Sequence, residues 1–368
     1  PAGEAPRPAG EAPRPAGEAP RPAGEAPRPA GEAPRLTAAQ RAVVEHAGGP
    51  AVVVAVAGAG KTTTMVARVR HRVAGGAVAA RHLLVVSFSR AAIRAVRDQL
   101  RADETLADVD VRTFHSLAHV LLATAARLGA DADRATRPGP AVRPTRPPPP
   151  PEALVARVAE RAAREARTTD PDLADAWRDV DLAAFAAYRG RCLARLELPE
   201  LDDLPAAARA EARPPPPDPE QPDHPRLFAD FERVRAALGW VDHDQLLVDA
   251  WAAWHRSKVL RAWARDRWRA AIVDEAQDVN PVQLSLLEGL TEGRSEVMLV
   301  GDDDQSVYGF RGAVPGSLRG FAARRQATVL ALPEAFRSRA EPLAGGPRGR
   351  GSARWRFPRS SRARTARR

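Results

Sequence analysis

From residue 36 onward, apolar residues form short runs and helical stripes whose order predicts an α/β fold. The stretch 36–49 carries apolar residues at helical spacing, with a threonine cap at its start and two glycines at its end. The apolar run 51–57 predicts a buried strand, and a helix follows over about 62–73. A second run, 83–89, leads directly into another helix. Because strands and helices alternate, we expect a parallel sheet covered by helices.

Two more strands are predicted after a long gap, over 270–275 and 296–304. Proline-rich breaks at 138–151 and 214–225 bracket a region rich in alanine, arginine and glutamate, which has a helical pattern. We interpret that region as a helical subdomain inserted into the sheet domain. The proline runs are interpreted as flexible loops rather than as partner-docking motifs.

Both ends of the chain are predicted to be disordered. Residues 1–35 are five identical copies of PAGEAPR, a unit without a large apolar residue, which cannot bury a hydrophobic face. Residues 341–368 contain nine arginines and one glutamate and show no periodicity. This segment carries most of the net charge of +10, so the remainder is nearly neutral and any basic groove in it has to be local.

Composition sets two further limits. Cys192 is the only cysteine, which excludes an internal disulfide and favours a buried structural thiol in a reducing compartment. No run approaches the roughly 20 apolar residues of a membrane span, and the N-terminal residues have no apolar signal core. We therefore expect a cytoplasmic protein that does not enter a membrane.

Only two of the 56 basic residues are lysines, and one of them, Lys61, lies in the loop AVAGAGKTTT between a predicted strand and a predicted helix. Gly58 and Gly60 let this loop turn consecutive backbone N–H groups towards one point, where the helix N-terminus adds partial positive charge. That point suits a phosphate, and a slender ammonium reaches between terminal phosphates better than a guanidinium does. Thr62 supplies a hydroxyl for Mg²⁺. The loop predicts a P-loop with Ala55 at its first glycine position; an incidental lysine in a glycine-rich turn is the weaker alternative.

Two acids end the predicted strand at 270–275, in the string AIVDEAQD. Because the carboxyl ends of parallel strands line ligand crevices, Asp274 and Glu275 are expected to face the P-loop. Asp274 is suited to hold Mg²⁺, directly or through water, and Glu275 to orient and deprotonate an attacking water. Such a pair can instead cap a helix, but beside a P-loop the catalytic interpretation is stronger.

These motifs resemble those of a known family. DEAQD, followed 22 residues after its last aspartate by VGDDDQSVYGFRGA, is similar to motifs II and III of the UvrD/Rep/PcrA group of superfamily-one DNA helicases. Further segments stand in the family's order. LTAAQ, SFSRAA, TFHSLA, VDHDQLL and LPEAFRS resemble the Q motif, motifs Ia and Ib, the acidic-leucine segment before motif II, and motif IV. The resemblance covers roughly residues 36–338.

The resemblance implies a RecA-like P-loop NTPase lobe that uses ATP and Mg²⁺. It also implies that Gln40 reads adenine, that Gln305 contacts the γ-phosphate and reports its presence, and that Arg337 reaches the γ-phosphate from a second lobe. The expected nucleotide site therefore has catalytic Glu275, Lys61, Gln305 and Arg337, nucleotide-binding Gln40, Ala57, Gly58, Ala59, Gly60, Lys61, Thr62 and Thr63, and metal-binding Thr62 and Asp274.

The resemblance further implies contacts to single-stranded DNA, from Phe88, His115, Tyr308 and Phe310, with Arg311 as a nearby cation. Base stacking on aromatic rings contributes about 1–3 kcal/mol per base and depends little on sequence, which suits a motor that passes every base. Core packing at a strand end is the alternative for Phe88, and a helix-start role is the alternative for His115. Phe310 stands where the family usually has tryptophan, which keeps a ring but reduces the stacking surface.

The expected division of the chain has six parts. They are disordered repeats over 1–35, the first part of the first RecA-like lobe over 36–114, the inserted helical subdomain over 115–235, the second part of that lobe over 236–330, the start of a second lobe over 331–340, and a disordered basic tail over 341–368. Motif IV has Ala335 and Phe336 where the family usually has asparagine and tyrosine. Motifs V and VI are not found after Ser338, so we expect a truncated or frame-shifted product. The alternative for the tail over 341–368 is a genuine nucleic-acid-binding arm.

By resemblance, the expected function is ATP-driven 3′-to-5′ translocation on single-stranded DNA, with unwinding at junctions of single-stranded and duplex DNA. For this chain, with a single lobe, we expect binding of Mg·ATP and DNA but little hydrolysis and no unwinding. A nucleotide- and DNA-binding fragment without turnover is the alternative. An unrelated P-loop kinase or transporter ATPase has no place for the string GDDDQSVYGFRG.

Overall fold

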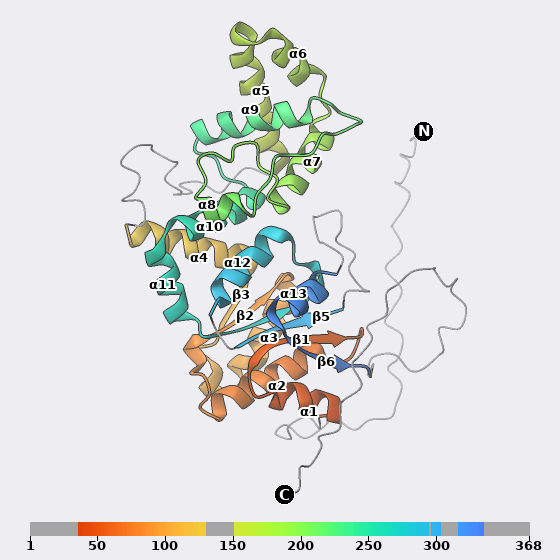
Figure 1. Cartoon of the computed structure of the whole chain (residues 1–368), viewed down its shortest axis with the longest axis vertical. Coiled ribbons are helices and arrows are strands. Elements are labelled where there is room, and N and C mark those ends of the chain that lie inside the picture. Colours follow the sequence, from red (N-terminus) through yellow and green to blue (C-terminus); the bar gives the residue numbers. More distant parts are fainter. Residues whose placement is uncertain (1–35, 130–150, 294–295, 303–315, 335–368) are drawn as a thin grey trace, which may run out of the picture. The chain divides into compact units, whose positions relative to one another are not determined.

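The computed structural model describes residues 36–129, 151–293, 296–302 and 316–334. Within these ranges, a parallel sheet of six strands runs in the order β3-β2-β4-β5-β1-β6 (Figure 1). The strands are β1 (Gly49–Ala55), β2 (Leu83–Ser87), β3 (Asp110–Thr113), β4 (Ala270–Asp274), β5 (Glu296–Gly301) and β6 (Thr328–Leu332). The expected α/β fold with a parallel sheet is confirmed.

Four strands follow the apolar runs of the sequence, whereas β3 and β6 had not been predicted. β3 has only four residues, and two of them are only partly buried. β6 lies at the end of the sheet order, and Leu332 is its only buried residue. It pairs with β1 as far as Ala55 and Leu332, so it continues two residues beyond 330, where the first lobe was expected to end.

Three helices pack on one face of the sheet: α1 (Ala38–Glu45), α2 (Lys61–Ala74) and α3 (Arg90–Arg101). Side-chain caps fix where two of them begin. Thr37 and Gln40 form a reciprocal capping box at α1, and the Ser89 hydroxyl accepts hydrogen bonds from the N–H groups of Ala91 and Ala92 at α3. The apolar sides of the three helices meet alternate residues of the strands, among them Val53, Val85 and Ile272.

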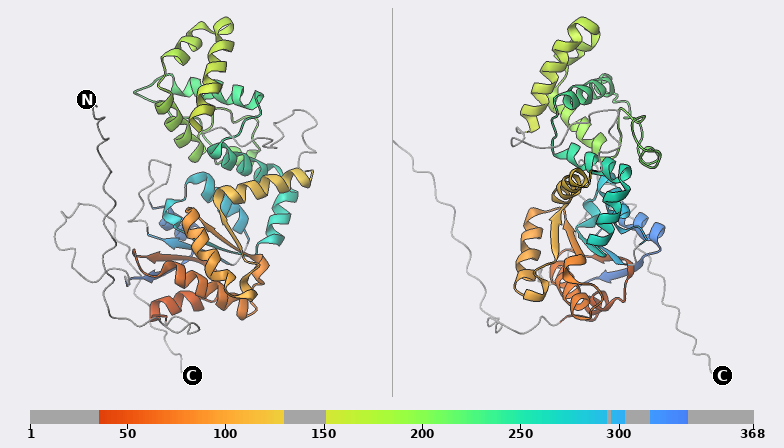
Figure 2. Two further views of the ribbon diagram at one scale, coloured as in Figure 1. Left: turned by 180° about the vertical axis from the view of Figure 1, so that it is seen from behind. Right: turned by 90° about the vertical axis from the view of Figure 1, so that its left-hand side faces the viewer.

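The opposite face carries α4 (Phe114–Arg127), α10 (His243–Arg256), α11 (Lys258–Arg267), α12 (Pro281–Thr291) and α13 (Ser317–Arg325) (Figures 1 and 2). The strand residues that face this side are the neighbours of the first set, such as Val52, Leu84 and Val273. Trp251 of α10 is completely buried in this second core. Short 3₁₀ turns are η1 (Ala80–His82), η2 (Glu104–Leu106) and η4 (Ala276–Asp278).

Between α4 and α10, the described residues form five helices: α5 (Pro151–Thr169), α6 (Pro171–Asp179), α7 (Leu182–Ala194), α8 (Ala206–Arg209) and α9 (His224–Ala237). Their buried side chains are continuous with the second core of the sheet domain. The prolines at 214–217 lie in the loop before α9. Cys192 is buried in α7, as expected for a structural thiol, and burial raises the pKa of its thiol to about 12.

Arg189 of α7 is the centre of a buried charge network among three helices. Its Nε lies 2.7 Å from Oε1 of Glu232 on α9, and its Nη1 lies 2.6 Å from Oδ2 of Asp242, which caps α10. The guanidinium also stands 4.7 Å from the ring centre of Phe231. Burial alone would raise the pKa of Asp242, but Arg189 and the N–H of Gln245 outweigh it and hold that pKa below its usual range. Asp242 is therefore ionised inside the fold.

The described residues test the prediction that the chain has no membrane-spanning helix, but not the prediction of disordered ends. None of the helices in the described ranges combines the length and the apolar character that a bilayer crossing requires. The predicted disordered ends, 1–35 and 341–368, lie outside the described residues.

Candidate active site

The sheet order brings the two predicted nucleotide motifs to one edge. β5 lies between β1 and β4, so the loop after β1 and the acids after β4 emerge on either side of the end of β5. All three strands are parallel, and their carboxyl ends therefore open on the same crevice. Residues 214 positions apart in the sequence, Lys61 and Glu275, meet there.

The loop after β1 has the backbone of a phosphate cradle. Gly58 and Gly60 have φ angles of 78° and 73°, a left-handed conformation that side chains disfavour. Gly60 is the N-cap residue of α2 and offers no side-chain cap, so the first N–H groups of the helix remain available to a ligand. Within the loop, Ala59 is buried and Ala57 is exposed. Thr62 and Thr63 follow Lys61 in the first turn of α2, where both are partly buried.

Gln40 is hydrogen-bonded to this loop and to the start of α1. Its side-chain Oε1 accepts from the N–H of Thr37 at 3.0 Å, and its Nε2 donates to the carbonyl of Ala59 at 3.2 Å. The side chain is buried, at 6% exposure. Gln40 therefore lies beside the phosphate loop, but its amide is engaged in capping α1 and in holding the loop.

Lys61 and Glu275 form an ion pair across the crevice. The ammonium Nζ lies 2.8 Å from Oε2 of Glu275, and the two side chains are 13% and 32% exposed. Glu275 has φ 50°, one of three positive values among the non-glycine residues of the described ranges. Such a conformation costs of order 1–3 kcal/mol and persists only where the surroundings hold it in place. Lys61 is thus paired with an acid whose backbone is held in a strained conformation.

Asp274 and Asp278 add two more carboxylates to the same place. Both are buried, and burial together with the neighbouring charge of Glu275 raises the pKa of each to about 6, although Lys61 opposes the shift. Oδ1 of Asp274 accepts from the N–H of Glu275, whereas Oδ1 of Asp278 is buried without a hydrogen-bond partner. Neither Asp274 nor Glu275 caps α12, because Asn280 does so. Within the described ranges, no group of three or more acidic, histidine or cysteine side chains is arranged to hold a metal ion, so the metal-binding roles of Thr62 and Asp274 stay predictions.

A glutamine inside the acidic motif joins this site to β5. Nε2 of Gln277 donates to Oε2 of Glu275 at 2.9 Å, and its Oε1 accepts from the N–H of Asp302 at 3.1 Å. Sequence reasoning did not select Gln277 or Asp278, although both stand within the quoted string DEAQD. The signal was present in the motif, but only the fold shows that the glutamine spans two strands.

Phe88 and His115 lie at the same edge, towards the other end of the sheet. Phe88 directly follows Ser87, which pairs with Thr113 of β3, and His115 stands two residues further on in α4. Phe88 is half-buried. The start of α4 is capped by Thr113 and Ser116 rather than by His115.

His115 is held neutral by its surroundings. Burial is the main cause, followed by the charges of His243, His119 and Arg90, and together they lower its pKa to about 4. The ring centre of His243, at the start of α10, is 4.8 Å away. A neutral imidazole suits stacking or a neutral hydrogen bond rather than attraction to phosphates. His243 is a further residue that sequence reasoning missed.

The low pKa of His115 predicts a pH effect on stability. Between pH 6.5 and about 4 the unfolded chain binds a proton at this position and the folded chain does not, so stability falls by up to about 3 kcal/mol as the pH drops through that window. Asp274 and Asp278 titrate in the same range with the opposite sign. The measurement is therefore the difference in unfolding free energy between wild type and His115→Gln, from urea unfolding at pH 7.5 and 4.5. A pH-independent difference would show that folded His115 takes up its proton normally.

Five predicted site residues lie outside the described residues: Gln305, Tyr308, Phe310, Arg311 and Arg337. Their roles in binding the γ-phosphate and DNA remain predictions from the sequence. The structure thus brings together the phosphate loop, Gln40 and the acids at one place, and Phe88 and His115 at another.

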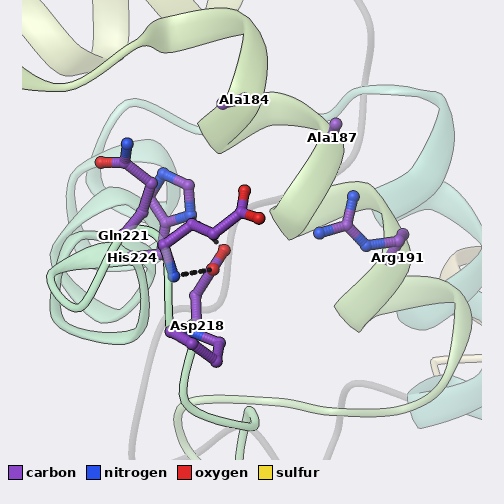
Figure 3. Close-up of a pocket in the computed structure, with 8 residues that line it drawn as sticks. Ala184, Ala187, Arg191, Asp218, Gln221 and His224 are labelled. Atoms are coloured by element: carbon purple, nitrogen blue, oxygen red, sulfur yellow. Dashed lines mark hydrogen bonds and ion pairs between the residues drawn. The ribbon is translucent and has the colours of Figure 1, made fainter.

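A cavity of about 440 Å³ lies away from this edge, against α7 and α9 (Figure 3). Asp218 and His224 line it, opposite Ala184, Ala187 and Arg191, and Nδ1 of His224 lies 2.9 Å from Oδ2 of Asp218. The bond to His224 holds the pKa of Asp218 below its usual range. Since His224 is only 1% exposed, we interpret the pair as an anchor for the proline-rich loop.

Comparison with known proteins indicates the family of this chain independently of the geometry of the site. Residues 36–325 match the family model described as UvrD/REP helicase N-terminal domain. ATP-dependent DNA helicase UvrD2 of Mycobacterium tuberculosis (strain ATCC 25618 / H37Rv) is 31% identical over 314 residues, which cover 81% of this chain and 41% of the relative. ATP-dependent DNA helicase Rep of Escherichia coli (strain K12) is 27% identical over 293 residues, covering 77% and 38%. This chain therefore spans less than half the length of these relatives.

Proposed function

Because the chain belongs to the UvrD/REP helicase family, matching its N-terminal domain, we propose that it is the nucleotide-binding lobe of a DNA motor that moves 3′ to 5′ along single strands and unwinds duplexes at junctions. The printed names of the UvrD2 and Rep relatives describe ATP-dependent DNA helicases. For the chain itself we propose binding of Mg·ATP and single-stranded DNA with slow hydrolysis and no unwinding. This expectation applies to the isolated 368-residue chain, whose family match is to an N-terminal domain.

The observation that carries this proposal is the contact between Lys61 and Glu275. The phosphate loop and the acidic motif are far apart in the sequence, and each has an ordinary structural explanation when taken alone. Their side chains nevertheless lie 2.8 Å apart at the carboxyl edge of a parallel sheet. A crevice with an ammonium, free helix N–H groups and buried carboxylates has the donors and acceptors that a nucleoside triphosphate and its cation require.

Each residue then has a defined task. Lys61 and the N–H groups of the phosphate loop hold the terminal phosphates. The adenine-reading role that the resemblance implies for Gln40 requires its amide to leave its present bonds to Thr37 and Ala59. Thr62 and Asp274 are the candidate ligands for Mg²⁺, which when bound neutralises phosphate charge. Glu275 orients a water molecule and takes its proton. The buried, unpartnered oxygen of Asp278 fits an additional hydrogen bond to this assembly.

On the DNA side, Phe88 and His115 offer rings at the β2 and β3 end of the same edge. The neutral state of His115 supports contact with bases rather than with the phosphate backbone. In the proposed motor, DNA therefore crosses the sheet edge beside the nucleotide crevice and does not enter it.

An ATPase assay on the chain, with and without single-stranded DNA, tests this function. We expect slow hydrolysis that DNA accelerates, and no unwinding of a duplex with a single-stranded tail. Glu275→Gln serves as the matched variant: it keeps the shape of the side chain, so nucleotide binding persists while hydrolysis is lost, because the amide cannot take a proton from water. Absence of nucleotide binding by the wild type would contradict the proposal, and unwinding by the chain would contradict its single-lobe form.

A further inference from the structure

We propose that Gln277 is a positioning residue that couples nucleotide binding to DNA binding by tying Glu275 to the end of β5. This inference rests on the proposed function, because it assumes that a nucleotide occupies the Lys61 crevice. It goes beyond that function by naming the side chain through which the crevice is connected to the neighbouring strand.

The amide of Gln277 has a single orientation that satisfies both of its neighbours. Its Nε2 donates to the Glu275 carboxylate, which can only accept, and its Oε1 accepts from the Asp302 N–H, which can only donate. A flipped amide would place oxygen against oxygen and nitrogen against nitrogen. The side chain is 4% exposed, so water does not compete readily for either bond.

The strand beneath is shaped to receive this amide. A Cβ added at Gly301 would overlap Oε1 of Gln277, and it would also press on the backbone nitrogens of Gln277 and Ala276 at 3.0 and 3.2 Å. The close approach therefore requires glycine at the end of β5. Because the amide lies directly on the backbone, a displacement of Gly301 or Asp302 moves Gln277 and, through it, Glu275.

The same carboxylate oxygen receives Lys61 and Gln277. Oε2 of Glu275 accepts from Nζ of Lys61 at 2.8 Å and from Nε2 of Gln277 at 2.9 Å. When Lys61 turns to a phosphate, Gln277 remains as the partner that holds Glu275 and that also holds β5. Asp302 is followed in the chain by residues 303–315, the segment for which the sequence predicts DNA contacts. Occupancy of the crevice and the position of the β5 end are thus linked through one side chain.

The test is the coupling between two binding equilibria. The affinity of the chain for a fluorescent oligothymidylate is measured by anisotropy without nucleotide and with saturating Mg·ATPγS, and the ratio of the two dissociation constants is the coupling factor. We expect roughly a 5-fold or larger factor for the wild type, the usual lower range for coupled sites. In Gln277→Ala the factor falls to one, while nucleotide and DNA each still bind alone with wild-type affinity.

Three further variants separate positioning from stability. Gln277→Glu keeps an acceptor for Asp302 but loses the donor to Glu275, and Gly301→Ala displaces the amide without removing it; both should lose coupling. Gln245→Ala removes a comparably buried glutamine whose side chain bonds to Arg189 and Asp249 rather than to Glu275 or Asp302, and it should keep the full factor even though it destabilises the fold.

Each alternative outcome overturns the inference in a recognisable way. A wild-type factor retained by Gln277→Ala would show that coupling does not pass through the amide. Loss of nucleotide binding itself in that variant would make Gln277 a binding residue. A wild type that binds both ligands with a factor of one would remove the coupling but leave the proposed function intact, whereas a wild type that binds no nucleotide would remove both.

Discussion

We expect Lys61→Ala to abolish the stabilisation of the chain by Mg·ATP. A ligand at 100 times its dissociation constant stabilises the folded state by about 2.7 kcal/mol, which raises Tm by roughly 5 to 10 °C for a domain of this size. Without the ammonium, the terminal phosphates would face Glu275, Asp274 and Asp278 without the charge of the lysine between them. The phosphate loop alone cannot offset that repulsion, so the rise in Tm should disappear.

The control for this experiment is the other lysine of the chain. Lys258→Ala changes an exposed position at the start of α11 and should keep the full nucleotide-dependent rise in Tm. The rise is compared within each variant, because losing the pair with Glu275 also changes the stability of the nucleotide-free protein. A rise in Lys61→Ala equal to that of the wild type would disprove the assignment of the phosphate loop.

The second large effect concerns the buried charge network. We expect Arg189→Ala to lower the free energy of unfolding by about 3–5 kcal/mol, because Glu232 and Asp242 would stay buried without their partner. Asp242 also accepts from the N–H of Gln245 at the start of α10, so loosening it frays that helix as well. Urea unfolding monitored by circular dichroism measures the change as a shift of the midpoint at constant slope.

Arg178→Ala provides the matched control on the neighbouring helix α6. Arg178 pairs with Asp175 one turn away, and both side chains are more than half exposed. Removal of this pair should change the unfolding free energy by less than about 1 kcal/mol. If Arg189→Ala lowered the unfolding free energy no more than Arg178→Ala does, water would have to reach Glu232 and Asp242, and the network would not be buried.

The sequence was informative where chemistry is local. Lys61 and the two glycines before it predict a phosphate loop within a few residues, and in the structure Gly58 and Gly60 have positive φ angles. Asp274 and Glu275 follow an apolar run, which is enough to place them at a strand end. Parallel strands share a carboxyl edge, so the meeting of these motifs followed from the fold class.

Other features depend on which elements are neighbours in space, which a single sequence does not state. Gln277 reaches Asp302 at the end of β5 only because β5 lies beside β4, and a separation of 25 residues in the sequence would have fitted another strand order equally well. Arg189 is one of 54 arginines, and its burial emerges only when α7, α9 and α10 converge. β6 was not predicted because an edge strand buries too few side chains to show a clear apolar pattern.

The pair between Lys61 and Glu275 has a consequence for ligand selection. An incoming nucleotide must compete with an internal anion for the lysine, and a triphosphate brings more negative charge to that competition than a diphosphate does. In the protein without nucleotide, the Glu275 carboxylate therefore takes the place of the terminal phosphate beside Lys61. Under the proposed function, discrimination between a nucleoside triphosphate and a diphosphate begins with the displacement of that carboxylate.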